Sequence, residues 1–458
     1  MTNLHIIQYN VHAEQRYFLG EFRELYNMIS LNGNIVSHTP QGVAAFLARA
    51  NKDFFIDPQT HAFQHPTIHL KRNISSREKG ESPRFDFKPS IRKLAESHLQ
   101  GVFASVLDND RPIMPADFFS SARNINNEIV AQTCENVVRF QKETLANSLD
   151  EEELEFIGEE DGLKPNFIIA PYFYLSPKYY REWLKINLAC YAATKAIVND
   201  VPVYLFLVIS KEALQKGQKA IIDQLSQIQP DGIFLWIDGH AEEHLTDAEI
   251  GNFIKLVKGL RDTTDVLCNY HGGYLSTLLC HSDLNNLFNG VGHSINYGEH
   301  RKVVPIGGGI PMARFYFPII HSRLRFGDGL GIILSKKWMS SASVYRENVC
   351  KCPQCTKLIQ SCDSVDLAFA AYGDSHPVEF RRRSGTVVRL EYPNSEAKQA
   401  AAYHYLYNKA HELREIETKP LSDLLDEMDE TFQDISPYVG EDLVDHLASW
   451  EKALSKIA

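Results

Sequence analysis

Residues 201–240 read VPVYLFLVISKEALQKGQKAIIDQLSQIQPDGIFLWIDGH, and this stretch decides the fold. Two apolar runs, Val201–Ser210 and Gly232–Asp238, flank a segment whose apolar residues recur at helical spacing. Continuous apolar runs without alternation are typical of parallel strands that are buried on both faces. The stretch therefore predicts two parallel strands joined by a helix.

Similar runs rich in Val, Ile, Phe and Tyr occur along the rest of the chain. Six of them bring the number of candidate strands to eight: Asn34–Ser37, Asp53–Asp57, Gly101–Asp108, Asn166–Tyr174, Asp265–Tyr270 and Gly290–Tyr297. Eight strand and helix units are the number that closes a (β/α)₈ barrel, the TIM barrel. We therefore predict an α/β protein built on such a barrel, with a doubly wound open sheet as the alternative.

Polar residues end several of these runs, at the face where barrel enzymes carry their chemistry. They are Ser37-His38, Asp57, Asp108-Asn109-Asp110, Asp238-Gly239-His240 and Asn269-Tyr270-His271. Any one of them has a structural explanation as well, because Asp and Asn also cap helices and end strands. Their accumulation on one predicted rim favours an active site there. The candidate carboxylates are Asp57, Asp108, Asp238 and Glu299.

The composition is that of a globular protein: 458 residues, of which 44% are hydrophobic and 23% charged. No apolar run approaches the roughly 20 residues needed to cross a bilayer, so we expect a cytoplasmic protein without membrane contact. The net charge of −11 excludes a surface that is basic all over. Basic residues nevertheless cluster at 71–93 and at Arg381-Arg382-Arg383, where they could contact a nucleic acid backbone.

A metal site is indicated by Cys350-Lys351-Cys352-Pro353-Gln354-Cys355, since three thiolates at this spacing can converge on one tetrahedral ion. The fourth ligand must come from elsewhere. The sequence alone leaves His376, His404 and His411 open, the last two on a predicted helix over Asn394–Ile416. Four protein ligands would leave no position for a water, so we expect a structural zinc ion.

These features divide the chain into three predicted parts. Residues 1–340 form the barrel, with 71–93 as a long basic loop on its rim and Met312–His321 as an extra strand or hairpin. Residues 341–418 form the zinc-binding region, and residues 419–458 form an acidic tail of amphipathic helices.

Three local stretches resemble the guanine transglycosylase superfamily, whose members exchange a guanine in tRNA, or in one branch DNA, for a 7-deazaguanine. Phe55–Gln64 is similar to the family's TDSGGFQ segment, which implies that Asp57 is a catalytic carboxylate. Val106–Pro112 is similar to FDECTP, which implies that Asp108 binds the base and that Asp110 lies beside it. His404–Tyr407 with Glu412–Ile416 resembles the HNLY…EEIRRI helix, which implies His404 as the fourth zinc ligand.

The chain also departs from that family. Phe234–Glu243 replaces the glycine-rich GGLAVGE loop, and Gly290–Glu299 lacks the nucleophilic Asp of the FDC motif. Glu299 stands where this Asp should be and is a candidate replacement. The predicted substrate-binding residues are Asp110, Asp238, His240 and Arg301, the last of them placed to contact a phosphate.

The resemblance implies a pentosyltransferase that acts on nucleic acid, and the divergent rim favours DNA over tRNA. It also implies a 7-deazaguanine base as second substrate, and a homodimer or a partner subunit. The missing FDC Asp supports an alternative, a catalytically inactive subunit that binds nucleic acid or a catalytic partner. A third possibility is an unrelated barrel hydrolase acting on a small molecule.

Overall fold

An eight-stranded parallel barrel forms the core of the computed structural model, which describes residues 3–74, 84–121, 124–149, 163–295, 299–304, 312–381, 386–440 and 443–457. The strands lie in the order β3-β2-β1-β10-β9-β8-β7-β6. Their bounds are β1 Leu4–Tyr9, β2 Met28–Asn32, β3 Asp53–Asp57, β6 Ile168–Ile169, β7 Val203–Ile209, β8 Gly232–Ile237, β9 Leu267–Asn269 and β10 Gly290–His293.

The two ends of the sheet, β3 and β6, meet through Asn166. The Asn166 amide donates to the Phe54 carbonyl (2.9 Å), and the Phe54 amide donates to Asn166 Oδ1 (2.8 Å). β1 pairs with both β2 and β10, so the first strand of the barrel lies beside the last. The sheet is thus a nearly closed barrel, which confirms the predicted α/β barrel and contradicts the open sheet.

Six of the eight predicted strands exist, but Asn34–Ser37 and Gly101–Asp108 are helices, α1 (Gly33–His38) and α4 (Gly101–Asn109). The Asn32 side chain caps α1 by accepting from the Asn34 amide (2.9 Å). In α4 the buried residues Phe103, Val106 and Leu107 recur at i, i+3 and i+4, which is helical spacing. Ser37-His38 and Asp108-Asn109-Asp110 therefore do not end strands. The missing strands of the barrel are β1 and β2.

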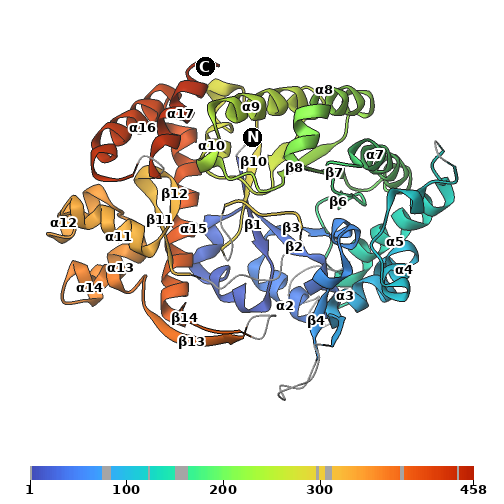
Figure 1. Cartoon of the computed structure of the whole chain (residues 1–458), viewed down its shortest axis with the longest axis horizontal. Coiled ribbons are helices and arrows are strands. Elements are labelled where there is room, and N and C mark those ends of the chain that lie inside the picture. The colour runs from blue at the N-terminus through green and yellow to red at the C-terminus, as the bar shows by residue number, and fades with distance from the viewer. Residues whose placement is uncertain are drawn as a thin grey trace.

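Helices surround the barrel (Figure 1). They are α2 (Pro40–Ala50), α3 (Pro89–Lys93), α5 (Asn127–Ala146), α7 (Tyr180–Ile197), α8 (Lys211–Ile228), α9 (Asp247–Arg261) and α10 (Tyr274–Leu278). Aromatic side chains fill the interior, where Phe55, Phe206 and Phe234 stack with centroids 4.9 and 5.1 Å apart. Part of the predicted loop 71–93 is instead a hairpin, β4 (Lys71–Asn73) and β5 (Phe85–Phe87), followed by α3; residues 75–83 lie outside the described part.

The C-terminal third packs along one side of the barrel (Figure 1). It contains the hairpin β11 (Arg314–Phe317) and β12 (Ser322–Arg325), four short helices, a second hairpin and the long helix α15 (Ser395–Thr418). The short helices are α11 (Phe326–Ser335), α12 (Ala342–Asn348), α13 (Pro353–Ser361) and α14 (Val365–Ala370), and the second hairpin is β13 (Ser375–Arg381) and β14 (Val387–Pro393). The extra strand or hairpin predicted over Met312–His321 is the single strand β11, whose partner β12 lies beyond His321, and the predicted helix over 394–416 is confirmed.

The acidic tail forms α16 (Leu421–Ile435) and α17 (Asp445–Leu454), as predicted. α17 docks on the barrel: Trp450 Nε1 donates to the Glu242 carbonyl (3.3 Å), and Lys452 pairs with Asp247 on α9 (2.6 Å). Among the described residues, no helix combines the length and the apolar character that a membrane crossing requires.

Candidate active site and metal centre

Asp57, the last residue of β3, is buried at the carboxyl end of the barrel, with 2% of its surface exposed. Its Oδ1 accepts a hydrogen bond from the Tyr172 hydroxyl (2.6 Å) and one from the Gln59 amide (2.9 Å). Burial raises the pKa of Asp57 to about 6, although the Tyr172 hydrogen bond, the Gln59 amide and the charge of Arg301 oppose the rise. A carboxyl with this pKa can take up and release a proton near neutral pH.

Asp238 directly follows β8 and reaches the same end of the barrel. Its Oδ2 accepts from the Tyr174 hydroxyl (2.9 Å), and its Oδ1 accepts from the Val303 amide (2.8 Å). Both oxygens of Asp238 thus accept hydrogen bonds, which fixes the orientation of the carboxyl group. The placement of Asp57 and Asp238 at strand ends agrees with the sequence analysis.

Residues 299–304, here called the covering segment, lie across this end of the barrel. The Arg301 carbonyl accepts from Trp236 Nε1 (3.0 Å) and from the Gly239 amide (3.3 Å), while Val303 packs into the barrel interior. The Arg301 guanidinium lies 5.9 Å from the centre of the Trp236 ring, and its charge acts on Asp57. The covering segment therefore brings a cation to the buried carboxylate.

Four buried polar atoms at this end of the barrel have no hydrogen-bond partner within the described chain: Gln8 Oε1, His61 Nδ1, His65 Nε2 and His271 Nε2. Burial lowers the pKa of His65 to about 4 and the pKa values of His61 and His271 well below the usual value. Each imidazole is therefore neutral and offers one donor and one acceptor. Because buried polar groups are normally paired, these atoms indicate a place for a ligand or for water.

Aromatic rings line the same place. His61 stacks on Tyr172 with centroids 5.1 Å apart and meets Trp236 edge-on at 5.2 Å. Tyr270 directly follows β9, and its hydroxyl shares a hydrogen bond with the Ser30 hydroxyl (2.8 Å). We use the name barrel mouth for the following residues: Gln8, Asp57, His61, His65, Tyr172, Trp236, Asp238, Tyr270 and His271. The sequence analysis missed His61, His65 and Gln8 as site residues, although His271 stood at a predicted strand end.

Three predicted site residues lie away from the barrel mouth. Asp108 and Asp110 are exposed at the end of α4, and Asp110 pairs with Lys71 (2.6 Å). Their predicted rim position rested on a strand that is in fact a helix. His240 is buried against Phe253 of α9, with ring centroids 4.6 Å apart, and burial lowers its pKa to about 3. It packs towards the outer helices.

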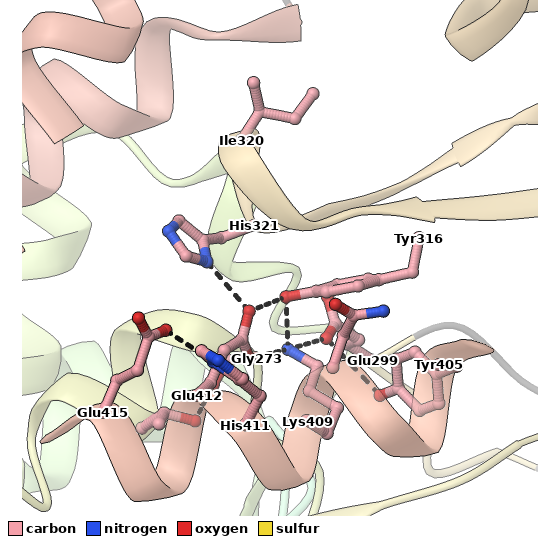
Figure 2. A network of polar contacts seen from close by, with 12 residues as sticks. Gly273, Glu299, Tyr316, Ile320, His321, Tyr405, Lys409, His411, Glu412 and Glu415 are labelled. Carbon is pink, nitrogen blue, oxygen red and sulfur yellow. Dashed lines mark hydrogen bonds and ion pairs between the residues drawn. The ribbon is translucent and has the colours of Figure 1, made fainter. Parts of the chain in front are cut away.

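Glu299 begins the covering segment but points into a buried network on α15 (Figure 2). Lys409 Nζ lies 2.5 Å from Glu299 Oε1 and 3.0 Å from Glu412 Oε2, and it donates to the Tyr316 hydroxyl (2.8 Å). His321 Nδ1 contacts Glu412 Oε1 at 2.8 Å. We call these five residues the α15 network. It holds Glu299 by an ion pair rather than presenting it to the barrel mouth.

The two carboxyls of the α15 network differ because one ammonium cannot balance both. Burial raises the pKa of Glu299 to about 7, against the attraction of Lys409. Burial would also raise the pKa of Glu412, but Lys409 and the His321 hydrogen bond together lower it. Glu412 therefore stays ionised over a wider pH range than Glu299, although both carboxyls contact the Lys409 ammonium.

Cys350, Cys352, Cys355 and His404 place their ligand atoms within 4.8 Å of one another, and all four side chains are buried. His404 Nδ1 lies 3.4 Å from the sulfurs of Cys352 and Cys355 and 3.7 Å from that of Cys350. His404 Nε2 contacts the Tyr316 carbonyl at 2.6 Å, which leaves Nδ1 for a metal. This cluster can hold a metal ion with four protein ligands.

The other two histidine candidates are excluded by position. His376 lies exposed on β13, and His411 is turned away towards Glu415 (2.9 Å). Backbone amides support the cluster, since the Cys352 amide donates to Cys350 Sγ (3.3 Å) and the Cys355 amide to Cys352 Sγ (3.4 Å). The donor set and these contacts fit a tetrahedral ion that prefers sulfur and nitrogen.

Comparison with family models, with curated proteins and with solved structures finds no match for this chain. The resemblance to the guanine transglycosylases therefore rests on the quoted motifs alone. Of the predicted nucleic acid contacts, Arg382 and Arg383 lie outside the described residues.

Proposed function

We propose that this chain is a pentosyltransferase of the guanine transglycosylase type, which exchanges guanine for a 7-deazaguanine base in DNA or tRNA at the barrel mouth. The observation that carries the proposal is the pair Asp57 and Asp238, set among aromatic rings and neutral histidines, each with one nitrogen that has no partner among the described residues. Such a place suits a flat base with several donors and acceptors, taken out of its stack.

Base exchange breaks the bond between the ribosyl C1′ and the leaving guanine, and it then forms the corresponding bond to the incoming base. A carboxylate must attack or stabilise the electron-poor C1′, and a proton must reach the leaving guanine. We assign the carboxylate at C1′ to Asp238, in place of the absent FDC Asp. Asp57, whose pKa is about 6, gives the proton and takes one back from the incoming base.

Arg301 and the histidines have distinct roles in this proposal. The Arg301 guanidinium favours the ionised form of Asp57 and would meet a phosphate of the substrate. His61, His65 and His271 supply donors and acceptors to the edge of the base. Zinc is the metal that we propose for the cysteine and histidine cluster, in a structural role, because four protein ligands leave no open position.

The test is incorporation of radiolabelled guanine into tRNA and into duplex DNA, which also distinguishes the two polymers. Asp57→Asn and Asp238→Asn should each lower the rate by at least about a hundredfold. Asp223→Asn on α8, an exposed carboxylate paired with Lys219, is the matched control and should retain the parental rate. Asp108→Asn should also retain it, because Asp108 is exposed on α4.

Absence of label in both polymers, with folded and metal-loaded protein, would contradict the proposal. Retained binding of nucleic acid in that case would favour the alternative, a catalytically inactive subunit. Equal loss of rate in Asp57→Asn and Asp223→Asn would instead mean that the barrel mouth is not the site of reaction.

A further inference from the structure

A cavity of about 180 Å³ lies beside the barrel between the hairpin β11–β12 and the first turns of α15. The side chains that matter are Tyr17, Ile295, Arg314, Arg323, Tyr392 and Lys398. A single water needs only roughly 10–15 Å³ of such space, so the cavity has room for a polyatomic ligand. Ile295 closely follows the end of β10 at His293, so the cavity adjoins the carboxyl end of that barrel strand.

The cavity is positively charged. Arg314, Arg323 and Lys398 line it, and the lining residues include no Asp or Glu. Neither Arg314 nor Lys398 forms an ion pair with a described carboxylate, and Lys398 Nζ instead lies 3.7 Å from the centre of the Tyr392 ring. Arg323 is held in place by the Ile295 carbonyl (2.8 Å) and by the Tyr405 ring, whose centre is 4.9 Å away. Among the described residues, Arg314 and Lys398 are thus placed at the cavity without a neutralising carboxylate.

The β11–β12 hairpin supplies a second, independent observation. Its register places Arg314 directly opposite Arg325, and the next pair on the same face joins Tyr316 to Arg323. Like charges opposite each other on neighbouring strands repel, and an anion bound beside Arg314 would reduce the repulsion between Arg314 and Arg325. The hairpin therefore places three arginines, Arg314, Arg323 and Arg325, on one face.

We infer that the cavity, here called the phosphate cavity, binds a phosphodiester of single-stranded nucleic acid next to the nucleotide in the barrel mouth. Arginine forks recognise phosphate oxygens, and tyrosines beside cations stack on unpaired bases, the combination by which proteins bind single strands. This inference rests on the proposed function for the position of the strand. It names a phosphate contact on β11 and α15 that the basic sequence clusters did not predict.

The experiment measures binding of fluorescein-labelled single-stranded DNA and RNA by anisotropy over a series of salt concentrations. Arg314→Gln with Lys398→Gln removes two charges from the phosphate cavity; Lys255→Gln with Lys258→Gln removes two exposed charges from α9 and is the control. The cavity variant should bind roughly tenfold more weakly, with a salt slope lower by about one. The control should change affinity by less than about twofold.

Equal weakening in the two double variants would overturn the inference, because charge alone would then explain binding. Competition with inorganic phosphate separates the two possible sources of the anion. If free phosphate binds the parent but not the cavity variant, while both bind the oligonucleotides equally, the cavity serves a free phosphate and the inference is wrong. Recovery of affinity in Arg314→Lys with Lys398→Arg would show that charge in this cavity is what the strand requires.

The outcome is separable from that of the proposed function. Guanine exchange by the parent together with unchanged oligonucleotide binding in the cavity variant would refute only the phosphate cavity. Weaker binding in the cavity variant without any exchange by the parent would refute only the transglycosylase. Thermal unfolding of each variant checks that it is folded.

Discussion

The barrel mouth and the α15 network are both buried and polar, but they satisfy their polar groups differently. In the α15 network Lys409 contacts three oxygens, and Glu412 is bound through both of its oxygens. At the barrel mouth Gln8, His61, His65 and His271 each leave an atom without a partner among the described residues. Within the described residues the polar groups of the α15 network are paired, whereas those of the barrel mouth leave donors and acceptors for a ligand or for water.

Buried polar groups therefore have two different roles in this protein. A satisfied network fixes one arrangement of the chain, and here it anchors Glu299 at the start of the covering segment. Unsatisfied groups cost free energy in the free protein and repay it on binding. We therefore expect substitutions in the α15 network to lower stability and substitutions at the barrel mouth to spare stability but remove activity.

The largest effect should come from Lys409→Met. It leaves two buried carboxyls without their cation, which destabilises the protein by about 3–5 kcal/mol. Chemical denaturation measures the free energy of unfolding. Lys142→Met is the control, because Lys142 forms a surface ion pair with Asp200 (2.5 Å) and such pairs contribute at most about 1 kcal/mol. Equal losses of unfolding free energy in the two variants would mean that the α15 network stabilises the protein no more than a surface ion pair does.

Asp57→Asn should act in the opposite direction at the barrel mouth. The pKa of Asp57 is raised from 3.8 to about 6, so the protonated carboxyl favours the folded state at low pH and this contribution is lost as pH rises through 6. The free energy of unfolding of the variant, relative to that of the parent, should therefore rise between about pH 4 and 7 by up to about 3 kcal/mol. Denaturation at several pH values tests this. If the free energies of unfolding of parent and variant depend on pH in the same way, burial of the ionised Asp57 carboxylate does not destabilise the fold, and the prediction is wrong.

Tyr372→Phe should weaken metal binding without abolishing it. The Tyr372 hydroxyl lies 3.2 Å from Cys355 Sγ, and loss of such an outer contact lowers metal affinity by roughly 10- to 100-fold. Competition with a chelating dye measures the affinity, and elemental analysis should find zinc. Cys355→Ser, which replaces a ligand atom, is the reference variant and should lower the metal affinity more than Tyr372→Phe does. An affinity equal to the parent's would mean that the hydroxyl does not support the thiolate.

The smallest change in stability is expected for His65→Leu. It removes a buried nitrogen that has no partner, so the free energy of unfolding should change by less than about 1.5 kcal/mol. Guanine exchange should fall sharply at the same time if His65 meets the base. Thermal unfolding and the exchange assay check the two halves of this prediction. A large loss of stability would place His65 among the structural groups instead.

The sequence predicts the barrel because buried parallel strands need long apolar runs, such as Val203–Ile209 and Gly232–Ile237. It misses β1, LHIIQY, because the strand is interrupted by His5 and by Gln8, whose side chain reaches the barrel mouth. It takes α4 for a strand because GVFASVL combines β-branched residues with Phe in one short run. Function and local composition thus both obscure the structural signal.

The two sites differ in the same way. The three cysteines lie within six residues, so their spacing alone predicts that they converge. Asp57 and Asp238 could be singled out because each ends an apolar run. Their hydrogen bonds with the Tyr172 hydroxyl and the Val303 amide could not be predicted, because these partners come from segments that only the closed barrel brings together. Glu299 was expected at the barrel mouth, but its ion pair with Lys409 depends on a helix more than a hundred residues away.

Because β1 lies between β2 and β10, the barrel cannot close on the ribosome until Gly290–His293 has emerged. Lys409, which anchors the covering segment, is synthesised roughly 5 to 20 seconds later at ordinary translation rates. Before β10 emerges, the nascent chain has β1 and β9 as edge strands on either side of the gap, and until Lys409 follows, Glu299 is not anchored. We expect chaperones to bind the nascent chain at this stage. We also expect His404, which lies on α15 with Lys409, to bind the metal when the chain is released from the chaperones.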